Sequence, residues 1–490
     1  MQYEPIIGLE VHAQLLTESK MFCRCRADYA TAPPNTRVCP ICLGMPGVLP
    51  TINRRAVEYA VMTALALNCT IPEFTKFDRK NYPYPDLMKG YQISQYDAPL
   101  SRHGWMNIEV DGQRKRVGIV RVHLEEDTAK LLHRRDPHGE PYSLVDVNRS
   151  GVPLLEIVSE PDLRSPEEAR QFLIRLRSIL LYLGVSTGSM EEGSFRCDAN
   201  VSVRPVGSMQ FGAKVEVKNM NSFRAVYRAL EYEIARQIRI LDSGGRVVQE
   251  TRGWVEERGI TVAQRTKEFA HDYRYFPEPD LPPLVFSREW VEELRRRLPE
   301  LPEARRDRLV SQYGLPLYDA NLLTETKAMA DFFEETVARM PERARAAKTV
   351  SNWMMGELRR LLAATGKELS DTPLKPDHLV ELLELIERGV ISEKIAKVVF
   401  EEVFRTGKRP EAVVREQGLT LISDTVELEA VIEEVLGINT KAVGDYLAGK
   451  VQAVTFLVGQ VMRATRGKAD PALTNRLVRE KLERLAGKPR

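Results

Sequence analysis

The sequence predicts an α+β protein in which an antiparallel sheet forms the N-terminal part and an all-helical region follows. Two observations predict this. Segments that alternate between apolar and polar residues recur through about the first 220 residues, where two helices with clear end signals interrupt them. After Phe276 nearly every segment has helical spacing and many charges. Because 490 residues exceed one ordinary core, we predict a sheet domain at 1–290, a helical domain at 291–408 and a small helical tail domain at 409–490.

The composition indicates a globular protein with almost balanced charge. The formal net charge is +2, with 43% hydrophobic and 29% charged residues, so a nucleic-acid partner must be met by a local basic patch. No apolar run approaches the roughly 20 residues that span a bilayer. The first strand begins so close to Met1 that it leaves no room for a signal peptide. We therefore expect a cytoplasmic protein with no membrane segment.

The first strand is predicted over residues 6–15. Ile7, Leu9 and Val11 fall on one face of an extended chain, and Glu10 and His12 fall on the other. On this strand alone, an exposed polar face with an incidental histidine is the simpler explanation. The significance of Glu10 and His12 therefore depends on what other strands contribute.

Four of the six cysteines form a Cys-x-Cys pair and a Cys-x-x-Cys pair, separated by 13 residues: Cys23, Cys25, Cys39 and Cys42. Two such pairs, joined by a loop with Pro33-Pro34 and closed by Gly44, can supply four sulfurs at tetrahedral geometry. Disulfides are rare in a reducing compartment. We therefore predict a structural zinc site in the loop 23–42, with four free buried thiols as the alternative. Cys69 and Cys197 are expected to be ordinary buried thiols.

The remaining elements of the sheet part are predicted from their own signals. A short amphipathic helix is expected at 54–67, and the stretch 145–158 alternates up to a Gly-x-Pro turn and then resumes. Ser165 and Glu168 make a capping box, and Gly184 follows the end of the helix that they begin. Ser222 caps a second long helix.

Further strands also carry a charged second face. Carboxylates with an imidazole suit a hard divalent cation, and arginine and lysine suit phosphates, so these faces favour a phosphoryl-transfer site on one face of the sheet. A solvent-exposed antiparallel sheet gives the same alternation and stays open as an alternative. The sequence has no phosphate-loop or dinucleotide-binding motif, so an ATP site must be of another type. The charged faces carry Arg121, His123 and Glu125; Asp198, Asn200, Ser202 and Arg204; and Lys214, Glu216 and Lys218.

The C-terminal part is predicted to be helical after a proline-rich linker. Pro277, Pro279, Pro282 and Pro283 would stiffen this linker. The last 28 residues, 463–490, hold nine basic residues against three acidic ones, which a solvated basic helix also explains. Helical spacing occupies 289–298, 328–340, 349–364, 376–388, 427–436 and 441–447.

Long strings spread over the chain carry a family resemblance: Gly8-Leu-Glu-Val-His-Ala-Gln-Leu15, Cys39-Pro-Ile-Cys-Leu-Gly-Met-Pro-Gly47, Lys89-Gly-Tyr-Gln-Ile-Ser-Gln95, Asp146-Val-Asn-Arg-Ser-Gly-Val-Pro-Leu-Leu-Glu156, Met190-Glu-Glu-Gly-Ser-Phe-Arg-Cys-Asp-Ala-Asn-Val-Ser-Val-Arg204, Lys218-Asn-Met-Asn-Ser-Phe-Arg224 and Asp272-Tyr-Arg-Tyr-Phe-Pro-Glu-Pro-Asp-Leu281. Over essentially its full length the chain resembles the B subunits of the aspartyl/glutamyl-tRNA(Asn/Gln) amidotransferases.

This resemblance implies an ATP-dependent reaction on a mischarged tRNA. The side-chain carboxylate of Glu-tRNA(Gln), Asp-tRNA(Asn) or both is phosphorylated, and ammonia then displaces the phosphate. The family also implies a cradle-shaped sheet domain similar to that of glutamine synthetase. It further implies a heterotrimer with an amidase (A) subunit and a small (C) subunit, because this chain has no glutaminase motif. The sequence does not distinguish between the two tRNA substrates.

The resemblance also implies roles for individual residues. Lys80, Arg204 and Lys218 are candidates for phosphate contacts in the ATP site or for guiding ammonia. The string Arg463-Ala-Thr-Arg-Gly-Lys-Ala-Asp470 resembles the family's tail signature, so Arg463, Arg466, Lys468 and Arg476 are expected to contact tRNA. The catalytic Mg²⁺ ligands are expected to be Glu10, His12, Glu125, Asp198 and Glu216.

Two other functions fit parts of the sequence. A zinc-stabilised tRNA-binding protein without catalysis explains the cysteines and the basic tail but leaves the charged sheet face unused. A standalone carboxylate–amine ligase acting on a small metabolite explains the sheet face but not the tail. ATP consumption that depends on mischarged tRNA excludes the first, and activity on free glutamate favours the second.

Overall fold

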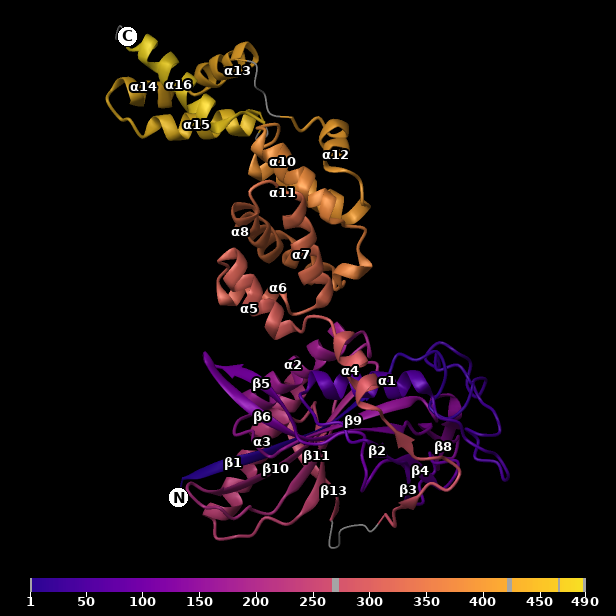
Figure 1. The fold of residues 1–490 in the computed structure, drawn as a ribbon. Helices are drawn as coiled ribbons and strands as arrows, with labels where there is room; N and C mark the ends of the chain where they lie inside the picture. The colour runs from indigo at the N-terminus through magenta and orange to yellow at the C-terminus, as the bar shows by residue number, and fades with distance from the viewer. Residues whose placement is uncertain (1, 267–272, 421–424, 466–467, 488–490) are drawn as a thin grey trace. The chain divides into compact units, whose positions relative to one another are not determined.

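The computed structural model describes residues 2–266, 273–420, 425–465 and 468–487, and its N-terminal part is built on an eight-stranded sheet (Figure 1). The strand order is β13-β12-β11-β10-β1-β9-β6-β5. These strands span β1 Tyr3–Gln14, β5 Gly104–Val110, β6 Gln113–Glu126, β9 Pro153–Ser159, β10 Phe195–Pro205, β11 Val215–Met220, β12 Glu250–Val255 and β13 Ile260–Thr266.

Short strands form three smaller sheets beside it. A three-stranded sheet has the order β14-β3-β4, β15 pairs with β2, and β7 forms a hairpin with β8. Their bounds are β2 Phe74–Thr75, β3 Asp78–Asn81, β4 Tyr91–Ser94, β7 Lys130–Arg135, β8 Pro141–Asp146, β14 Phe276–Pro277 and β15 Leu284–Val285.

Three helices pack on one face of the large sheet, and the alternation of β1 explains which face. Ile7, Leu9 and Val11 are almost fully buried in a single core with α1 (Arg54–Ala66), α2 (Pro166–Leu183) and α3 (Phe223–Asp242). The polar residues of β1 point to the opposite face. The sequence prediction for this strand is confirmed, and the helices leave its polar face for other chemistry.

The sheet is mixed, which corrects the prediction of an antiparallel sheet. Strands β11 and β12 pair in parallel, while the other neighbours in the large sheet pair antiparallel. Helix α3 joins β11 to β12 and returns the chain to the end of the sheet where β11 began. A helical crossover of this kind produces a parallel pair, whereas a short turn would have produced an antiparallel one.

The predicted helix signals are found with one difference. Ser165 accepts a hydrogen bond from the backbone N–H of Glu168, and Gly184 ends α2 in the left-handed conformation. The Glu168 carboxylate accepts its bond from the N–H of Arg164 and not from that of Ser165. Ser222 caps α3 as predicted.

A bulge interrupts the alternation of β6. Val122 and Leu124 are buried in the core, but Val120 is only half-buried. The pairing of β6 with β9 shifts register between Ile119 and Arg121, so a bulge at Val120 lets Ile119 take the core position. The bulge leaves the charged face of residues 121–125 intact.

The proline-rich segment after Phe276 is not a linker. It supplies β14 and β15, and Glu278 lies buried in an ion pair with Arg79, at 2.7 Å from Nε. The following helix α4 (Arg288–Arg296) packs against α1. The first compact unit therefore runs to Pro302, beyond the predicted boundary at residue 290.

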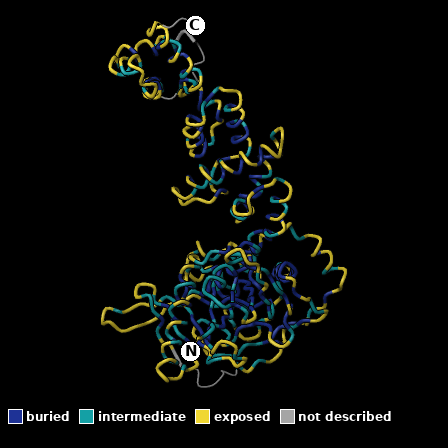
Figure 2. The backbone as a smooth tube through the Cα atoms, turned by 90° about the vertical axis from the view of Figure 1, so that its left-hand side faces the viewer, coloured by how far each residue is buried: buried dark blue, intermediate teal, exposed yellow. Residues whose placement is uncertain are grey.

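The second compact unit, Glu303–Arg490, is helical throughout its described residues. It holds two separate hydrophobic clusters, one from Leu309 to Val414 and one from Leu428 to Leu482. Figure 2 shows buried residues inside each part and exposed ones along the outer turns. The helices are α5 Pro302–Tyr313, α6 Leu317–Leu323, α7 Lys327–Arg339, α8 Arg343–Trp353, α9 Arg359–Thr365, α10 Pro376–Glu387, α11 Glu393–Thr406, α12 Pro410–Glu416, α13 Thr425–Ile438, α14 Thr440–Leu447, α15 Ala453–Ala464 and α16 Pro471–Leu485.

The predicted start of the tail, residue 409, falls before a helix that belongs to the preceding cluster. Val413 and Val414 of α12 are buried there against α10 and α11. The tail cluster begins only with Leu428 of α13. Met354 lies in the first helical cluster and Trp353 packs against it, where Trp353 meets Phe400 edge-on at 5.6 Å between ring centroids.

Candidate functional site

The polar face of the large sheet brings together an imidazole and two carboxylates from three neighbouring strands. Strand β9 lies between β1 and β6, and Glu156 is in register with His12 on one side and with His123 on the other. His12 Nε2 lies 3.3 Å from Glu125 Oε1 and 3.5 Å from Glu156 Oε2. One donor atom from each of His12, Glu125 and Glu156 can be chosen so that all three lie within 4.8 Å of one another. We call these three residues the carboxylate cluster.

The positive charge of His12 partly balances the negative charges of the two carboxylates in the cluster. Burial opposes protonation of His12, but its hydrogen bonds to Glu125 and Glu156 outweigh burial and raise its pKa to about 10. Burial likewise opposes ionisation of Glu156, yet nearby positive charges and the His12 hydrogen bond hold its pKa well below the ordinary value. Without another cation, the cluster therefore holds a protonated imidazole between two carboxylates.

Lys80 contributes a further positive charge beside this cluster. Burial disfavours its charged form, but the carboxylates of Glu125 and Glu156 raise its pKa above the ordinary lysine value. Its Nζ lies 5.3 Å from the centroid of the Tyr273 ring and 5.9 Å from that of Tyr82. The structure thus places Lys80, a candidate for phosphate contacts or for guiding ammonia, close to Glu125 and Glu156.

The donor set of the carboxylate cluster fits a divalent cation. Glu125 is almost fully buried, and its Oε2 has no hydrogen-bond partner in the described part of the chain. His123 is also buried; its Nδ1 has none there either, and burial lowers its pKa so that the ring stays neutral. Buried polar atoms without partners are uncommon, and carboxylate oxygens with imidazole nitrogen are ligands for Mg²⁺ or a transition metal. These residues could therefore hold a metal ion.

The other predicted acids form a second group farther across the same face. Asp198 is in register with Glu10 on the adjacent strand, and Glu216 lies on β11 beyond it. Lys218 Nζ contacts Asp198 at 2.7 Å and Glu216 at 3.2 Å, while Glu10 accepts a hydrogen bond from Asn200 at 2.8 Å. The structure therefore divides the five predicted Mg²⁺ ligands between two groups, with Lys218 already paired in the second.

Arg204 lies away from both groups. It forms an ion pair with Glu4 at 2.7 Å, and these residues are in register near the start of β1. Arg204 lies six positions after Asp198 along β10, which is about 20 Å in an extended strand. Arg204 shares a strand face with Asp198, and the resemblance made it a candidate, but the structure does not bring it to either group.

Glu156 is the site residue that the sequence reasoning did not assign. Its signal was available, because it is the only charged residue between Val152 and Val158. A carboxylate inside such an apolar run must find a partner when the strand is buried. Which partner it finds depends on the order of the strands, and only the fold supplies that information.

The four predicted cysteines form a second cluster that could hold a metal ion. Cys23, Cys25, Cys39 and Cys42 offer sulfur atoms that all lie within 4.8 Å of one another. The backbone N–H of Cys39 donates to Cys42 Sγ at 3.1 Å, and Gly44 closes the turn at a φ of +67°. Hydrogen bonding from the Cys23 thiol, with help from the charge of Lys20, lowers the pKa of Cys42 to about 5. We call these four residues the thiol cluster.

Side chains on both sides hold the loop that carries the thiol cluster against the end of β8 and the segment after it. Asn35 donates to the backbone oxygen of Val145, and the Asn148 side chain donates to Pro33 and accepts from the N–H of Arg37. These bonds connect the loop to one of the strings that carry the family resemblance, 146–156. Cys69 and Cys197 are buried outside the cluster, as predicted.

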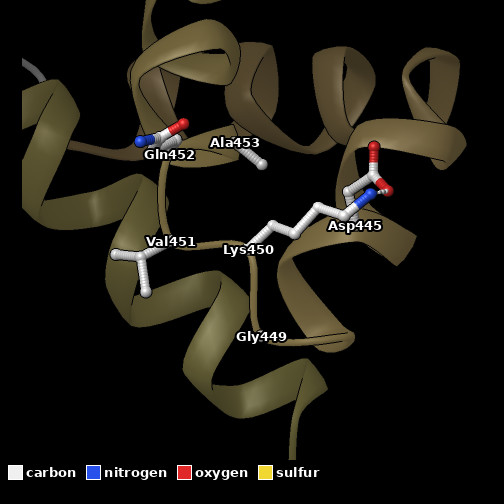
Figure 3. A pocket seen from close by; sticks show the side chains of 6 residues that line it. All are labelled: Asp445, Gly449, Lys450, Val451, Gln452 and Ala453. Atoms are coloured by element: carbon white, nitrogen blue, oxygen red, sulfur yellow. Dashed lines mark hydrogen bonds and ion pairs between the residues drawn. The ribbon is translucent and has the colours of Figure 1, made fainter.

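The predicted tRNA-contacting residues lie in the tail. Arg463 at the end of α15 and Arg476 on α16 are exposed, and Lys468 is half-buried between these helices. Arg466 falls outside the described residues. A hollow between α14 and α15 lies in the same cluster of helices (Figure 3), where Lys450 pairs with Asp445 at 2.9 Å. The hollow is lined by Asp445, Gly449, Lys450, Val451, Gln452 and Ala453. None of the candidate catalytic residues lies among them, so we do not place the functional site there.

Comparison with known proteins decides the family. The profile described as "GatB/GatE catalytic domain" matches residues 5–292, and the one described as "GatB domain" matches residues 331–482. The chain belongs to the GatB family. Its relatives include the B subunit of the aspartyl/glutamyl-tRNA(Asn/Gln) amidotransferase of Carboxydothermus hydrogenoformans, 57% identical over 484 residues that cover 99% of this chain and all of the relative.

Two other GatB relatives with the same name agree. The protein of Caldanaerobacter subterraneus is 58% identical over 99% of this chain, and that of Moorella thermoacetica is 59% identical over 98%, both along their full length. The first GatB profile spans the carboxylate and thiol clusters, so both lie in the part described as catalytic. None of the helices in the described residues has the length and apolar character that crossing a membrane requires.

Proposed function

We propose that this GatB chain activates the side-chain carboxylate of Glu-tRNA(Gln), Asp-tRNA(Asn) or both, and then converts it to the amide. The observation that carries the proposal is the carboxylate cluster, His12 with Glu125 and Glu156, on the face of the sheet opposite the three helices. The names of the relatives supply the substrates, since those proteins are aspartyl/glutamyl-tRNA(Asn/Gln) amidotransferase subunits.

The chemistry requires activation, because a carboxylate is a poor electrophile. A substrate carboxylate oxygen attacks the γ-phosphorus of ATP, the bond to the bridging oxygen breaks and ADP leaves. Ammonia then attacks the carbonyl carbon of the acyl phosphate, the carbon–oxygen bond to phosphate breaks and the nitrogen loses a proton. The chain's contribution is to position the two substrates and to balance charge as phosphate groups approach the acids.

Each group on the sheet face has a proposed part in that task. Glu125, Glu156 and His12 would hold Mg²⁺, with Glu10, Asp198 and Glu216 as further acids along the face. Bound Mg²⁺ would neutralise phosphate charge. Lys80 and Lys218 would contact phosphate or guide ammonia, whereas Arg204 lies about 20 Å along β10 from Asp198 and is no longer proposed for this part. The analogy of this face with the cradle of glutamine synthetase supports the proposal at the level of fold only.

The thiol cluster is proposed to hold a structural zinc ion. Four sulfur donors within 4.8 Å fit tetrahedral zinc and leave no open coordination position for chemistry. Metal analysis of the purified chain tests this, with one zinc per chain expected. A chain that folds normally without zinc or iron contradicts the proposal.

The partners and the tail complete the proposal. Ammonia would come from glutamine hydrolysed by an amidase (A) subunit, held with a small (C) subunit in a heterotrimer, and the complex would act in the cytoplasm. The full chain alone should use ammonium salts but not glutamine, and glutamine use by the chain alone contradicts this division. Arg463, Arg466, Lys468 and Arg476 would contact tRNA, and deletion of residues 410–490 should weaken tRNA binding.

The decisive experiment removes one charge from the carboxylate cluster. Glu125→Gln keeps the shape of the side chain but removes a cation ligand, so phosphate release that depends on mischarged tRNA and ammonium should fall to background, as it should in Glu10→Ala. The matched control is Glu58→Gln, which changes another buried glutamate, paired with arginines on α1, and should retain activity. Full activity of Glu125→Gln would overturn the assignment.

A further inference from the structure

Lys20 is a lysine with no exposed surface, three residues before the first cysteine of the thiol cluster. Its backbone N–H donates to the oxygen of Cys25 at 2.9 Å. Its ammonium group donates to the backbone oxygen of Val147 at 3.4 Å, which is long for a hydrogen bond from a charged donor. An ammonium group has three donors, so this single weak bond leaves it poorly satisfied.

A buried ammonium group needs a compensating negative charge. Transfer of a lysine charge from water to a protein interior costs several kcal/mol unless the charge is paired. Within the described residues, no carboxylate forms an ion pair with Lys20, whereas Lys89, which is only half-buried, pairs with Glu126, and Lys218 pairs with Asp198. The compensation for Lys20 must come from a different kind of group.

The thiol cluster lies where that compensation is needed. A Cβ atom built at Gly151 would meet Cδ of Lys20 at 3.4 Å and Cβ of Cys42 at 3.8 Å, so both side chains pack against the same point of the backbone. Gly151 adopts a φ of +85°, a conformation that glycine takes without strain, and this lets the segment pass close to both.

We propose that Lys20 is the buried counter-charge of the thiol cluster. The inference rests on the proposed zinc site and extends it to a residue that does not touch the metal. Four thiolates around a divalent ion carry a net charge of −2, and a lysine beside Cys42 offsets one of these charges inside the protein. Lys20 is thus a positioning residue that stabilises the negative charge of the cluster, and the cluster in turn explains why an ammonium group can be buried there.

The test compares zinc retention in full-length variants. Lys20→Met removes the charge but keeps an unbranched side chain, and Lys20→Arg keeps the charge. Lys115→Met is the matched control, since Lys115 pairs with Glu168 away from the thiols. Zinc release to a chromogenic chelator should be roughly 10- to 100-fold faster in Lys20→Met than in the wild type, near the wild-type rate in Lys115→Met and close to it in Lys20→Arg. The Co²⁺-substituted proteins give an independent readout, because thiolate-to-cobalt absorption should weaken in Lys20→Met alone.

The outcomes separate the inference from the zinc proposal. A wild-type chain that folds without zinc overturns both. If the wild-type chain holds one zinc and Lys20→Met releases it at the same rate, the zinc proposal stands and only the proposal that Lys20 is the counter-charge is overturned. If Lys20→Met does not accumulate, Cys42→Ser is compared with the double variant Cys42→Ser/Lys20→Met. Removing one partner leaves a buried charge alone, so the double variant should melt at a higher temperature than Cys42→Ser. A double variant that is no more stable than Cys42→Ser contradicts the proposal that Lys20 is the counter-charge.

Discussion

The two clusters that could hold a metal ion lie in the same unit of the chain but are assembled differently. All four donors of the thiol cluster come from residues 23–42, on one loop. The carboxylate cluster takes His12, Glu125 and Glu156 from three strands that are far apart in the sequence. The thiol cluster fastens its own loop, whereas the carboxylate cluster exists only after the sheet has formed. We therefore expect the first to serve stability and the second to serve chemistry.

The energetic state of the two clusters agrees with this division. Glu125 keeps a buried oxygen without a hydrogen-bond partner in the described part of the chain, and a buried group in this state costs about 1–3 kcal/mol. In the thiol cluster, by contrast, the backbone N–H of Cys39 donates to Cys42. Active sites often retain such unfavourable arrangements because the bound substrates or ions need them. Substitutions in the two clusters should therefore have opposite effects on activity and stability.

Among the substitutions that compare the two clusters, Glu156→Gln should change the rate most, and it is the strictest test of this division. It removes a charge from the centre of the carboxylate cluster, so amidation should fall roughly 10³-fold, which corresponds to about 4 kcal/mol of activation free energy. The melting temperature should stay within a few degrees of the wild type, because the glutamine fills the same space. Initial rates with ammonium and mischarged tRNA, with differential scanning calorimetry, measure both quantities.

A buried glutamate outside the cluster provides the control for this variant. Glu250 on β12 is buried and paired with Arg236 and Arg252, at 3.4 and 2.7 Å. Glu250→Gln should lower stability and keep activity, the reverse of Glu156→Gln. If Glu156→Gln instead lost stability and kept its rate, the carboxylate cluster would be a structural element and the division of roles would be wrong.

Cys39→Ser should give the next largest effect, now on stability. Loss of one sulfur donor should remove zinc from the loop and lower the free energy of unfolding of the sheet unit by about 3 kcal/mol. Cys69→Ser, which changes a buried thiol outside the cluster, should leave the zinc content unchanged. Zinc analysis and chemical unfolding give the measurements. A zinc-free Cys39→Ser that unfolds at the wild-type denaturant concentration would show that the thiol cluster does not support the fold.

The same contrast explains what could be predicted from the sequence. The thiol cluster was predicted residue for residue because its donors are close in the chain and their spacing is itself the signal. Alternation placed His12 and Glu125 on the polar faces of their strands. It could not show that β9 lies between those strands, so Glu156 was missed and Arg204 was kept. Strand order depends on contacts between distant segments, as does the parallel pairing of β11 with β12.

Errors at the domain boundaries have a similar origin. Prolines between Phe276 and Pro283 suggested a linker, but proline is also accepted in short edge strands, as Pro277 is in β14. Likewise, α12 looked like the start of the tail because Pro410 begins it. The burial of Val413 and Val414 against α10 and α11 assigns it to the helical cluster before the tail. Local signals located the elements but not the partners on which they pack.

Gly44→Ala should have a smaller effect, on the thiol loop alone. Gly44 has a φ of +67°, and a Cβ there would lie 2.7 Å from Cγ of Lys89 and 3.0 Å from its backbone. The combined strain should lower the free energy of unfolding by about 2 kcal/mol, as chemical unfolding would measure. Gly47→Ala separates the two causes, because Gly47 has a φ of +83° but no atom within 4 Å of its Cβ position, so it should cost only about 1 kcal/mol.

The rate of the Gly44→Ala variant tells whether the two clusters are independent. Lys89 also pairs with Glu126, the neighbour of Glu125, so a displaced Lys89 is the direct route from the thiol loop to the carboxylate cluster. If the clusters act separately, the initial rate of Gly44→Ala should remain within about twofold of the wild type. A large loss of rate in a folded, zinc-containing variant would show that the thiol loop also tunes the chemistry.

Glu334→Gln should have the smallest effect, a small loss of stability. It measures how much a carboxylate whose two oxygens are both hydrogen-bonded contributes to folding. In the helical unit Arg305 Nε donates to one oxygen of Glu334 at 2.6 Å, and Arg308 donates to the other at 2.7 Å. Although burial works in the opposite direction, these bonds lower the pKa of Glu334. A lowered pKa in the folded state stabilises the protein above the unfolded pKa, about 4.3, and this contribution disappears as the pH falls through the folded pKa.

The wild type should therefore exceed Glu334→Gln in stability by at most about 1 kcal/mol at neutral pH, and the difference should shrink as the pH falls below about 4. Urea unfolding of both proteins from neutral pH down to about pH 3 measures it. A difference that stays constant over this range would mean that shape and not charge accounts for the contribution of Glu334. The charge of Glu334, although fully hydrogen-bonded, would then add no more to folding stability than the charge of Glu125, which keeps an oxygen without a partner in the described part of the chain. The proposed difference in stability between the two carboxylates would therefore be smaller than expected.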